Sequence, residues 1–333
     1  MKLIIQIPCF NEADALPATL AALPKSIPGI DTIEVLVVDD GSIDGTADVA
    51  RANGVAHIVR HRGNRGLAAA FQSGLDASLA AGADIIVNTD ADGQYVGEDI
   101  AALVAPVAAG QADIVIGDRG VGRNEHFHPV KRQLQRLGSM IVRRLSRTTV
   151  TDAVSGCRAI SRDAAQRINI TSDFSYTTEM LIQAGRKRMA VQSVPIRTNG
   201  AVRPSRLFRS IPHFIVNTTA TMLRAWAMYN PLRAFVSAGL VAFLIGMAPM
   251  IRFLWFYFSG EGGGHVQSLV IGAVCILFGV LAMMLGALAD LIGRNRRLTE
   301  QVLERMRMLE ERISLINGGE DPEADPPRRF GRR

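Results

Sequence analysis

The chain has 333 residues and a formal net charge of +6, and 48% of its residues are hydrophobic. That hydrophobic share is high for a purely soluble protein and indicates a membrane part. The positive net charge fits nucleic acid, anionic lipid or acidic substrates as partners, and the positions of the basic residues must decide between them. Cys9, Cys157 and Cys275 are isolated, which argues against a disulfide framework or a structural zinc site. The N-terminus has no signal-peptide pattern, so we expect the front half on the cytoplasmic side.

Short apolar runs alternate with longer stretches of helical composition through roughly the first 120 residues, which is the pattern of βαβ units. The predicted strands are Leu3–Pro8, Ile33–Asp39, Val55–Arg60, Asp84–Asp90 and Ala112–Asp118. The predicted helices between them are Glu12–Leu23, Gly45–Ala52, Gly66–Ala81 and Glu98–Ala108. The sequence therefore predicts an α/β domain with a mostly parallel sheet.

Polar clusters follow these strands at the point where each one ends. They are Asn11-Glu12, Asp39-Asp40, Asn64, Asp90–Gln94 and Asp118-Arg119. A functional site in a parallel sheet normally lies at the carboxyl ends of its strands. Five clusters at corresponding places therefore predict one site at this edge of the sheet.

The middle of the chain is less regular, and its character changes before the membrane part. We expect a basic helix over Lys131–Arg147, a second helix over Tyr176–Arg186 and a strand over Met189–Arg197. Residues 207–232 interleave aromatic and aliphatic side chains with Arg209, His213 and Arg224, which is typical of an amphipathic helix. That helix either lies in the membrane interface or packs on the front domain.

Two uncharged stretches follow, Ala234–Ile251 and Val266–Ala289, and each is long enough to cross a bilayer. Arginines flank the outer ends of the pair, and the Gly-rich linker between the spans has no Lys or Arg, so the positive-inside rule places both ends of the pair in the cytoplasm. Arg252 would have to snorkel to the outer interface. The alternative is a buried helical hairpin in a soluble core.

The end of the chain divides into a charged helix and a polar tail. Val302, Met306, Leu309, Ile313 and Ile316 are spaced 4-3-4-3. This spacing fits a short coiled coil, which would make the protein a homo-oligomer, and it fits a solvated amphipathic helix equally well. The predicted organisation is a catalytic domain over 1–206, juxtamembrane helices over 207–232, a transmembrane hairpin over 233–292, a cytoplasmic helix over 293–316 and a disordered tail over 317–333.

The acidic cluster Asp90-Ala91-Asp92-Gly93-Gln94 follows an apolar strand. Carboxylates two residues apart at a strand end can converge on one hard cation, with an amide oxygen beside them. Bound there, Mg²⁺ or Mn²⁺ would neutralise charge on a leaving diphosphate. The alternative is an Asp-rich turn that caps a helix.

Three further motifs carry charged side chains or a Gly-rich turn that could contact a nucleotide. The adjacent carboxylates Asp39 and Asp40 repel each other unless a ligand or donor holds one, whereas Asp44 is explained by the start of the next helix. Glu12 also favours a helix start. The turn Arg62–Gly66 could meet phosphate, but it lacks the spacings of Rossmann and P-loop motifs.

Together these motifs resemble family 2 glycosyltransferases of the GT-A fold, and their pattern is similar to the polyprenyl-phosphate hexose synthases. The resemblance runs from Ile4 to about Arg206, and the two C-terminal spans match the membrane-anchored members. It implies inverting transfer of a hexose from a UDP- or GDP-linked sugar to a polyprenyl phosphate at the cytoplasmic membrane face. The implied partners are this donor, this acceptor and the lipid bilayer, and no nucleic acid.

The resemblance also implies a role for individual positions on the donor side. Asp90 and Arg119 would be catalytic, with Arg119 near phosphate in Gly117-Asp118-Arg119, and Asp92 and Gln94 would hold Mg²⁺ or Mn²⁺. The positions that would bind the nucleotide sugar are Pro8, Phe10, Asn11, Glu12, Val38, Asp39, Asp40, Asp90 and Ala91.

On the acceptor side, the resemblance implies a set of phosphate-binding residues. They are Lys131, Arg132, Arg158, Arg203, Ser205 and Arg206, and Glu179 matches a further acidic position of the family. Arg158 belongs to the element Asp152–Arg158, which resembles D-x-x-S-G-F-R with Cys157 in place of the aromatic residue. The arginines could instead be solvated basic surface, but a phospholipid acceptor needs cations near the bilayer.

The chain departs from the family pattern after the acidic cluster. The family often has D-A-D-L-Q-H-P, whereas this chain has Gly93, Tyr95 and Val96 at the fourth, sixth and seventh places. The Q-x-x-R-W signature of processive synthases is absent, which argues against a polymerase. An enzyme of the same fold that acts on another lipid or a cell-envelope glycan and a non-catalytic membrane scaffold are the alternatives, and the intact acidic cluster argues against the scaffold.

Overall fold

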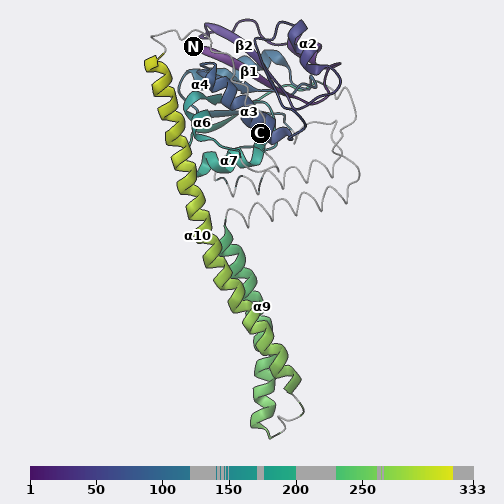
Figure 1. Cartoon of the computed structure of the whole chain (residues 1–333). Helices are drawn as coiled ribbons and strands as arrows, with labels where there is room; N and C mark the ends of the chain where they lie inside the picture. Colours follow the sequence, from purple (N-terminus) through teal and green to yellow (C-terminus); the bar gives the residue numbers. More distant parts are fainter. Residues whose placement is uncertain are drawn as a thin grey trace, which may run out of the picture.

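The protein is described from a computed structural model. The structure describes residues 1–120, 140, 143, 146, 148, 150–170, 176–199, 230–260, 264 and 266–317. Figure 1 shows a globular α/β domain from which two long helices project. The predicted basic helix over Lys131–Arg147 lies almost entirely outside the described residues, and so do the predicted amphipathic helix and the C-terminal tail.

A seven-stranded sheet with the order β3-β2-β1-β4-β6-β5-β7 forms the centre of the domain. Its strands are β1 (Lys2–Cys9), β2 (Thr32–Asp39), β3 (His57–Arg60), β4 (Ile85–Asn88), β5 (Ile114–Asp118), β6 (Arg158–Ser161) and β7 (Val191–Pro195). The pairs β1–β2, β1–β4, β2–β3 and β5–β7 are parallel. The predicted strands and the mostly parallel sheet are therefore confirmed.

Strand β6 is the part of the sheet that the sequence did not predict. It lies between β4 and β5 and runs antiparallel to both. Its four residues begin with Arg158, whose charge hides the strand from any search for apolar runs. The helix after it, α6 (Arg162–Arg167), begins at Ser161, whose hydroxyl accepts a hydrogen bond from the Ala164 amide at 3.2 Å.

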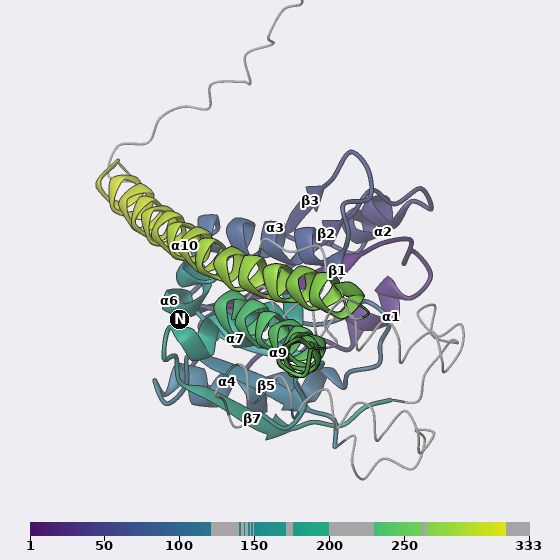
Figure 2. The same cartoon turned by 90° about the horizontal axis from the view of Figure 1, so that it is seen from below.

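Helices cover both faces of the sheet, as Figures 1 and 2 show. The helices of the domain are α1 (Leu16–Ala21), α2 (Thr46–Ala52), α3 (Leu67–Ala80), α4 (Ile100–Ala108), α6 (Arg162–Arg167) and α7 (Tyr176–Arg186), with a short 3₁₀ turn over Gly97–Asp99. On one face Phe71 of α3 and Met180 of α7 lie in a buried cluster with Ile4 of β1. On the other face Leu16 of α1 and Leu103 of α4 lie in a buried cluster with Val87 of β4. Burial of apolar surface on both faces explains why β1 and β4 read as continuous apolar runs.

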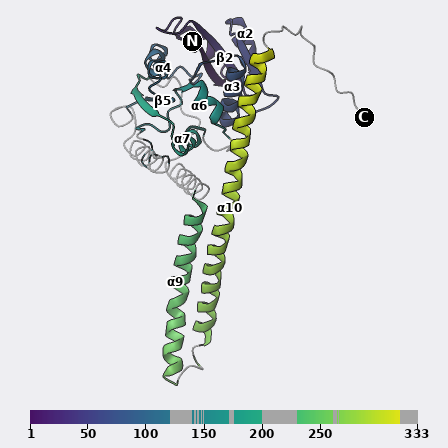
Figure 3. The same cartoon turned by 90° about the vertical axis from the view of Figure 1, so that its left-hand side faces the viewer.

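The two projecting helices are α9 (Pro231–Phe258) and α10 (Val266–Asn317). Pro231–Phe258 and Val266–Gly293 are long and apolar enough to cross a membrane, and only 11% and 17% of their apolar windows are buried. The hairpin is therefore not the buried core of a soluble domain, which was the alternative from the sequence. Figure 3 shows the two helices side by side and pointing away from the sheet.

Glycines bring the backbones of α9 and α10 into close contact. A Cβ atom on Gly239 would lie 2.6 Å from the Gly279 carbonyl oxygen, and one on Gly246 would lie 2.8 Å from the Gly272 carbonyl oxygen. Such contacts admit no side chain, which is the usual way that apolar helices associate in lipid. The hairpin is thus built for helix packing and not for exposure to water.

Helix α10 is longer than the span predicted from the sequence. It runs for 52 residues, so the predicted cytoplasmic helix over 293–316 continues the second span without a break. Leu298, Val302, Met306 and Leu309 are exposed along this extension. The change from apolar to charged composition after Gly293 therefore does not end the helix.

Candidate functional site

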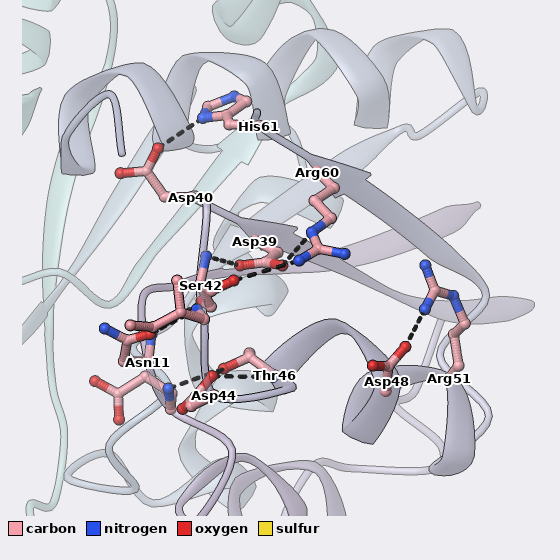
Figure 4. A network of polar contacts seen from close by, with 12 residues as sticks. Asn11, Asp39, Asp40, Ser42, Asp44, Thr46, Asp48, Arg51, Arg60 and His61 are labelled. Atoms are coloured by element: carbon pink, nitrogen blue, oxygen red, sulfur yellow. Dashed lines mark hydrogen bonds and ion pairs between the residues drawn. The ribbon is translucent and has the colours of Figure 1, made fainter. Parts of the chain in front are cut away.

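The carboxyl ends of β1 and β2 are joined by a network of polar contacts, shown in Figure 4. Asn11 adopts a left-handed conformation, with φ of 54°. Its amide donates to the Ser42 hydroxyl at 2.9 Å, and its side-chain oxygen accepts from the Ile43 amide at 3.0 Å. The Glu12 amide donates to the Thr46 hydroxyl at 3.0 Å. These bonds fix the loop that presents Phe10, which is 38% exposed at the mouth of this edge.

Asp39 is fully buried at the end of β2 and is held from two sides. One oxygen accepts from the Ser42 amide at 2.8 Å, and the other lies 3.2 Å from Arg60 Nε. Asp44 accepts from the Thr46 amide at 3.0 Å at the start of α2, in accord with its expected role at a helix start. Asp39 therefore supports the loop over Gly41–Asp44.

Asp40 is also buried and holds the next loop, which runs from His61 to Gly66. Its carboxylate accepts from His61 Nδ1 at 2.7 Å, from the Arg65 amide at 2.9 Å and from the Gly66 amide at 2.8 Å. His61 Nε2 lies 2.9 Å from the Ser73 hydroxyl, so the chain of bonds ends on α3. Because a carboxylate has about four lone-pair positions, these contacts compete with the predicted contact of Asp40 to a base or ribose.

A hollow of about 440 Å³ lies beside this network at the β2–β3 edge, and its lining includes Arg60, His61 and Arg62. Gly41, which also lines it, has a φ of 76°, and a Cβ there would lie 2.5 Å from the Gly63 backbone. Only glycine allows the two loops to approach so closely. The sequence did not single out His61, whose importance depends on contacts with distant residues.

Asp90 and Asp92 lie just beyond the end of β4, at the centre of the edge. Burial, together with the nearby charge of Asp92, raises the pKa of Asp90 to about 6. Asp92 is partly exposed and accepts from the Gln94 amide at 3.1 Å. Two carboxylates that disfavour each other's charge are suited to share a cation.

The donor set fits a hard divalent cation, with carboxylate oxygens from Asp90 and Asp92 and an amide oxygen from Gln94. Within the described part of the chain, no group of three or more His, Cys, Asp or Glu side chains could hold a metal ion. A cation bound here would therefore need oxygen atoms from a ligand or water to complete its shell. This is the kind of site that Mg²⁺ uses when it binds substrate phosphates.

The loop Asp92–Tyr95 is bonded to Thr198 and Asn199, which follow strand β7 in the chain. Thr198 forms a β-bridge with Tyr95, and the Asn199 amide donates to the Gln94 carbonyl at 2.8 Å. The Asn199 side chain donates to the Gly93 carbonyl at 3.0 Å. The loop that carries Asp92 and Gln94 is therefore held by the residues that follow β7.

Arg119, at the end of β5, lies beside this acidic pair. Its guanidinium makes a two-pronged contact with Asp152, with Nε and Nη2 at 2.7 and 3.0 Å from the two carboxylate oxygens. Asp118 accepts from the Thr151 hydroxyl at 2.6 Å. Arg119 is close enough to Asp90 to oppose the rise in the pKa of that carboxyl. The structure thus brings Gly117–Arg119 and Asp152–Arg158 together around Asp90.

Arg158, for which a phosphate contact was predicted, is held by protein carbonyls in this structure. Arg158 is fully buried, and its guanidinium donates to the carbonyls of Ser155, Thr177 and Ala153 at 2.8, 2.9 and 2.8 Å. Each of the three guanidinium nitrogens donates to a protein carbonyl, and the side chain is fully buried. Arg158 instead fastens the loop over 152–158 to the start of α7.

The remaining predicted residues divide into buried positions and positions outside the described part. Glu179 is 3% exposed on α7 and accepts from Gln183 Nε2 at 3.3 Å. Pro8, Val38 and Ala91 are buried at the ends of β1, β2 and β4. Burial raises the pKa of the Cys157 thiol to about 12, so this thiol stays protonated. Lys131, Arg132, Arg203, Ser205 and Arg206 lie outside the described residues.

Comparison with known proteins gives matches to the same region. The family model described as "Glycosyl transferase family 2" matches residues 4–168. Undecaprenyl-phosphate mannosyltransferase from Micrococcus luteus is 31% identical over 206 residues, covering 59% of this chain and 83% of that protein. Polyprenol monophosphomannose synthase from Mycolicibacterium smegmatis is 30% identical over 206 residues, covering 59% and 76%.

A solved structure shares the fold at much lower identity. It is glucosyl-3-phosphoglycerate synthase from Mycobacterium tuberculosis, in complex with Mn²⁺, UDP and phosphoglyceric acid. The TM-score is 0.52 at 18% identity, with 68% of this chain and 78% of that chain covered. The mixed sheet, the polar strand ends and these matches agree, and the chain belongs to glycosyl transferase family 2 and is a glycosyltransferase of the GT-A fold.

Proposed function

We propose that this enzyme transfers a hexose from a nucleotide-diphosphate sugar to a polyprenyl phosphate at a membrane surface, with inversion at the anomeric carbon. The observation that carries the proposal is the Asp90–Asp92 pair beside Arg119, in a domain mounted on an exposed apolar hairpin. The names of the two bacterial relatives, which are undecaprenyl-phosphate and polyprenol enzymes, support the choice of acceptor.

The donor nucleoside is assigned to the loops after β1 and β2. Phe10 is exposed there, and Asn11 and Glu12 lie in a loop fixed by Ser42 and Thr46. Asp39 and Asp40 would act mainly by shaping the loops around the nucleoside, because Asp40 accepts from the Arg65 and Gly66 amides and one Asp39 oxygen accepts from the Ser42 amide. The donor is either UDP- or GDP-linked under this proposal.

The donor diphosphate is assigned to the Asp90–Gln94 loop. Asp92 and Gln94 would hold a Mg²⁺ or Mn²⁺ ion, and Asp90 and Ala91 would lie along the ribose and diphosphate. The bound cation would neutralise negative charge on the leaving diphosphate. Asp152 accepts two hydrogen bonds from the Arg119 guanidinium and so fixes its orientation. The remaining N–H groups of Arg119 would donate to phosphate oxygens in the same region.

The proposed reaction does not require a strong general base. A phosphate acceptor is already largely ionised near neutral pH, so its oxygen can attack the anomeric carbon directly as the nucleotide diphosphate departs from the opposite face. The chain would then contribute orientation and charge stabilisation. Asp90 would orient the reacting groups, and Lys131, Arg132, Arg203, Ser205 and Arg206 are assigned to the acceptor phosphate.

The membrane arrangement follows from charge at the ends of the hairpin. Arg224 and Arg233 precede α9 or lie in its first turn, and Arg294, Arg296 and Arg297 follow the apolar part of α10. By the positive-inside rule both ends of the hairpin, and with them the catalytic domain and both termini, are assigned to the cytoplasmic face of the membrane. A lipid phosphate held at that face would meet the sheet edge from the membrane side.

An acceptor assay tests the proposal. Purified full-length protein in detergent would be given labelled nucleotide hexoses with undecaprenyl phosphate or diacylglycerol, each with Mn²⁺, Mg²⁺ or EDTA. We expect a labelled polyprenyl phosphate hexose with one donor and no product in EDTA. Product on diacylglycerol alone would favour the same fold acting on another lipid, and the absence of a polyprenyl product with every donor would contradict the proposal.

A further inference from the structure

Tyr95 is placed at the junction of the two loops that meet around Asp90. It follows Gln94 directly and stands where the family often has histidine. Its hydroxyl accepts a hydrogen bond from the Gly156 amide at 2.9 Å, and this bond joins the loop after β4 to the loop before β6.

Gly156 packs directly on the carboxylate of Asp90. A Cβ atom at Gly156 would lie 2.8 Å from both Asp90 carboxylate oxygens, which real side chains do not tolerate. The Gly156 carbonyl accepts from Asn88 Nδ2 at 2.8 Å, at the end of β4. The peptide at Gly156 is therefore held at its carbonyl by Asn88 and at its amide by Tyr95.

Tyr95 is itself well anchored. Its backbone pairs with Thr198, and the preceding Gln94 carbonyl is held by the Asn199 amide. The ring is partly buried. A hydroxyl held in this way can fix the position of the Gly156 peptide that donates to it.

We propose that Tyr95 is a positioning residue, whose hydroxyl holds the Gly156 peptide against the Asp90 carboxylate and so joins the loop Asp90–Tyr95 to the loop Asp152–Arg158. This inference rests on the proposed function. The second loop carries Asp152, which orients Arg119. The Tyr95 hydroxyl thus fixes the loop that holds Arg119 relative to the Asp90 carboxylate.

The test compares Tyr95→Phe with Tyr176→Phe in the full-length protein. Tyr176 is a matched control because its hydroxyl is also a buried hydrogen-bond partner, accepting from Asn88 Nδ2 at 3.2 Å. Asn88 keeps its bond to Gly156 when that hydroxyl is removed. Each substitution deletes one hydroxyl and keeps the ring, so the loss of a buried hydrogen bond is common to both.

Two readouts separate positioning from folding. In Tyr95→Phe we expect kcat to fall about 10- to 100-fold, with the KM for the sugar nucleotide within about twofold of wild type, because a misplaced group costs rate more than binding. In the absence of substrate and metal, hydrogen exchange followed by mass spectrometry should show faster exchange of the Gly156 amide in Tyr95→Phe only. Tyr176→Phe should change neither quantity by more than about twofold.

The outcomes are distinct. Equal losses of kcat in the two variants, or a wild-type kcat in Tyr95→Phe, would overturn the positioning role. Unchanged exchange at Gly156 in Tyr95→Phe would overturn the bridge itself. If the wild-type protein transferred no sugar to any polyprenyl phosphate, the proposed function would fail, whereas the exchange measurement would still decide whether Tyr95 joins the two loops.

Discussion

The carboxylates after β2 and those after β4 look alike in the sequence but have different surroundings. Asp39 and Asp40 each accept hydrogen bonds from nearby loop amides and have a basic side chain beside them. Asp90 instead has a pKa raised to about 6 by burial and by the charge of Asp92. A pair of neighbouring carboxylates can therefore either stabilise a loop or remain available to bind a charged ligand. The groups that surround the pair determine which of these two roles it has.

The largest effect that would sharpen this contrast is expected for Asp92→Ala. Loss of this carboxylate should lower metal-dependent sugar transfer at least about 100-fold, because charge stabilisation by a bound cation is worth several kcal/mol. The melting temperature should stay close to that of wild type, since Asp92 is partly exposed and, among the described residues, its carboxylate accepts only from the Gln94 amide. Transfer assays over a Mn²⁺ titration, beside thermal unfolding, check both statements, and full activity in the variant would remove the cation assignment.

Arg158→Leu should have the next largest effect, and that effect should be on stability. Three buried carbonyls would lose their donor, so we expect a loss of about 3–5 kcal/mol in the free energy of unfolding. Denaturant unfolding of the variant measures this loss. If Arg158 bound the acceptor phosphate, as the sequence resemblance implied, the variant would keep its stability and show a raised KM for polyprenyl phosphate instead.

Asp40→Ala is the matched test at the β2 end. Removing the carboxylate leaves the Arg65 and Gly66 amides and His61 without their acceptor, which should cost about 2–3 kcal/mol of stability. The decisive comparison is with Asp92→Ala in the same unfolding experiment. An Asp40→Ala protein as stable as wild type would show that the two acidic motifs do not differ as described here.

The smallest expected effect concerns the pH dependence of Asp90 in metal-free protein. Its pKa is about 6 when folded and 3.8 ordinarily, so the folded state binds more protons between these values. Stability from this group is therefore fully present below about pH 4 and is lost as pH rises through 6. Asp90→Asn should raise the free energy of unfolding by about 1–2 kcal/mol at pH 7.5 in EDTA.

The control for this prediction is the same pair of proteins at low pH. At pH 4 the two should differ by much less, because Asp90 is then protonated in the folded protein. Chemical unfolding at the two pH values measures the difference. An equal difference at both pH values would show that the carboxyl is not raised in pKa by its surroundings.

The sequence predicted the parallel part of the fold because local pattern carries it. Apolar runs such as Leu3–Pro8 and Ile33–Asp39 match β1 and β2 to within a residue or two, and Tyr176–Arg186 matches α7 at both ends. Strand β6 was missed because only pairing with β4 and β5 makes its four residues a strand. Helix α10 was divided at its change of composition, although helical propensity continues across that point.

The candidate site was predictable as a set of positions but not as a set of contacts. The spacing of Asp90 and Asp92 after an apolar strand is enough to predict a cation site. The bridge from Tyr95 to Gly156 joins residues that are 61 apart in the chain. The burial of Arg158 depends on loop carbonyls such as that of Ser155. No local sequence pattern encodes either contact. Resemblance assigns a residue to a motif, and packing decides whether its side chain faces a ligand.

Binding of Mn²⁺ is the most direct test of the central claim, which is that the β4 end holds the cation and the donor diphosphate. Electron paramagnetic resonance of free Mn²⁺ would be followed as wild-type, Asp92→Ala and Asp40→Ala proteins are titrated with UDP or GDP present. We expect wild-type protein and folded Asp40→Ala to bind one Mn²⁺ per chain with the preferred nucleotide, and Asp92→Ala to bind none. Equal Mn²⁺ binding by the Asp92→Ala protein would contradict the account.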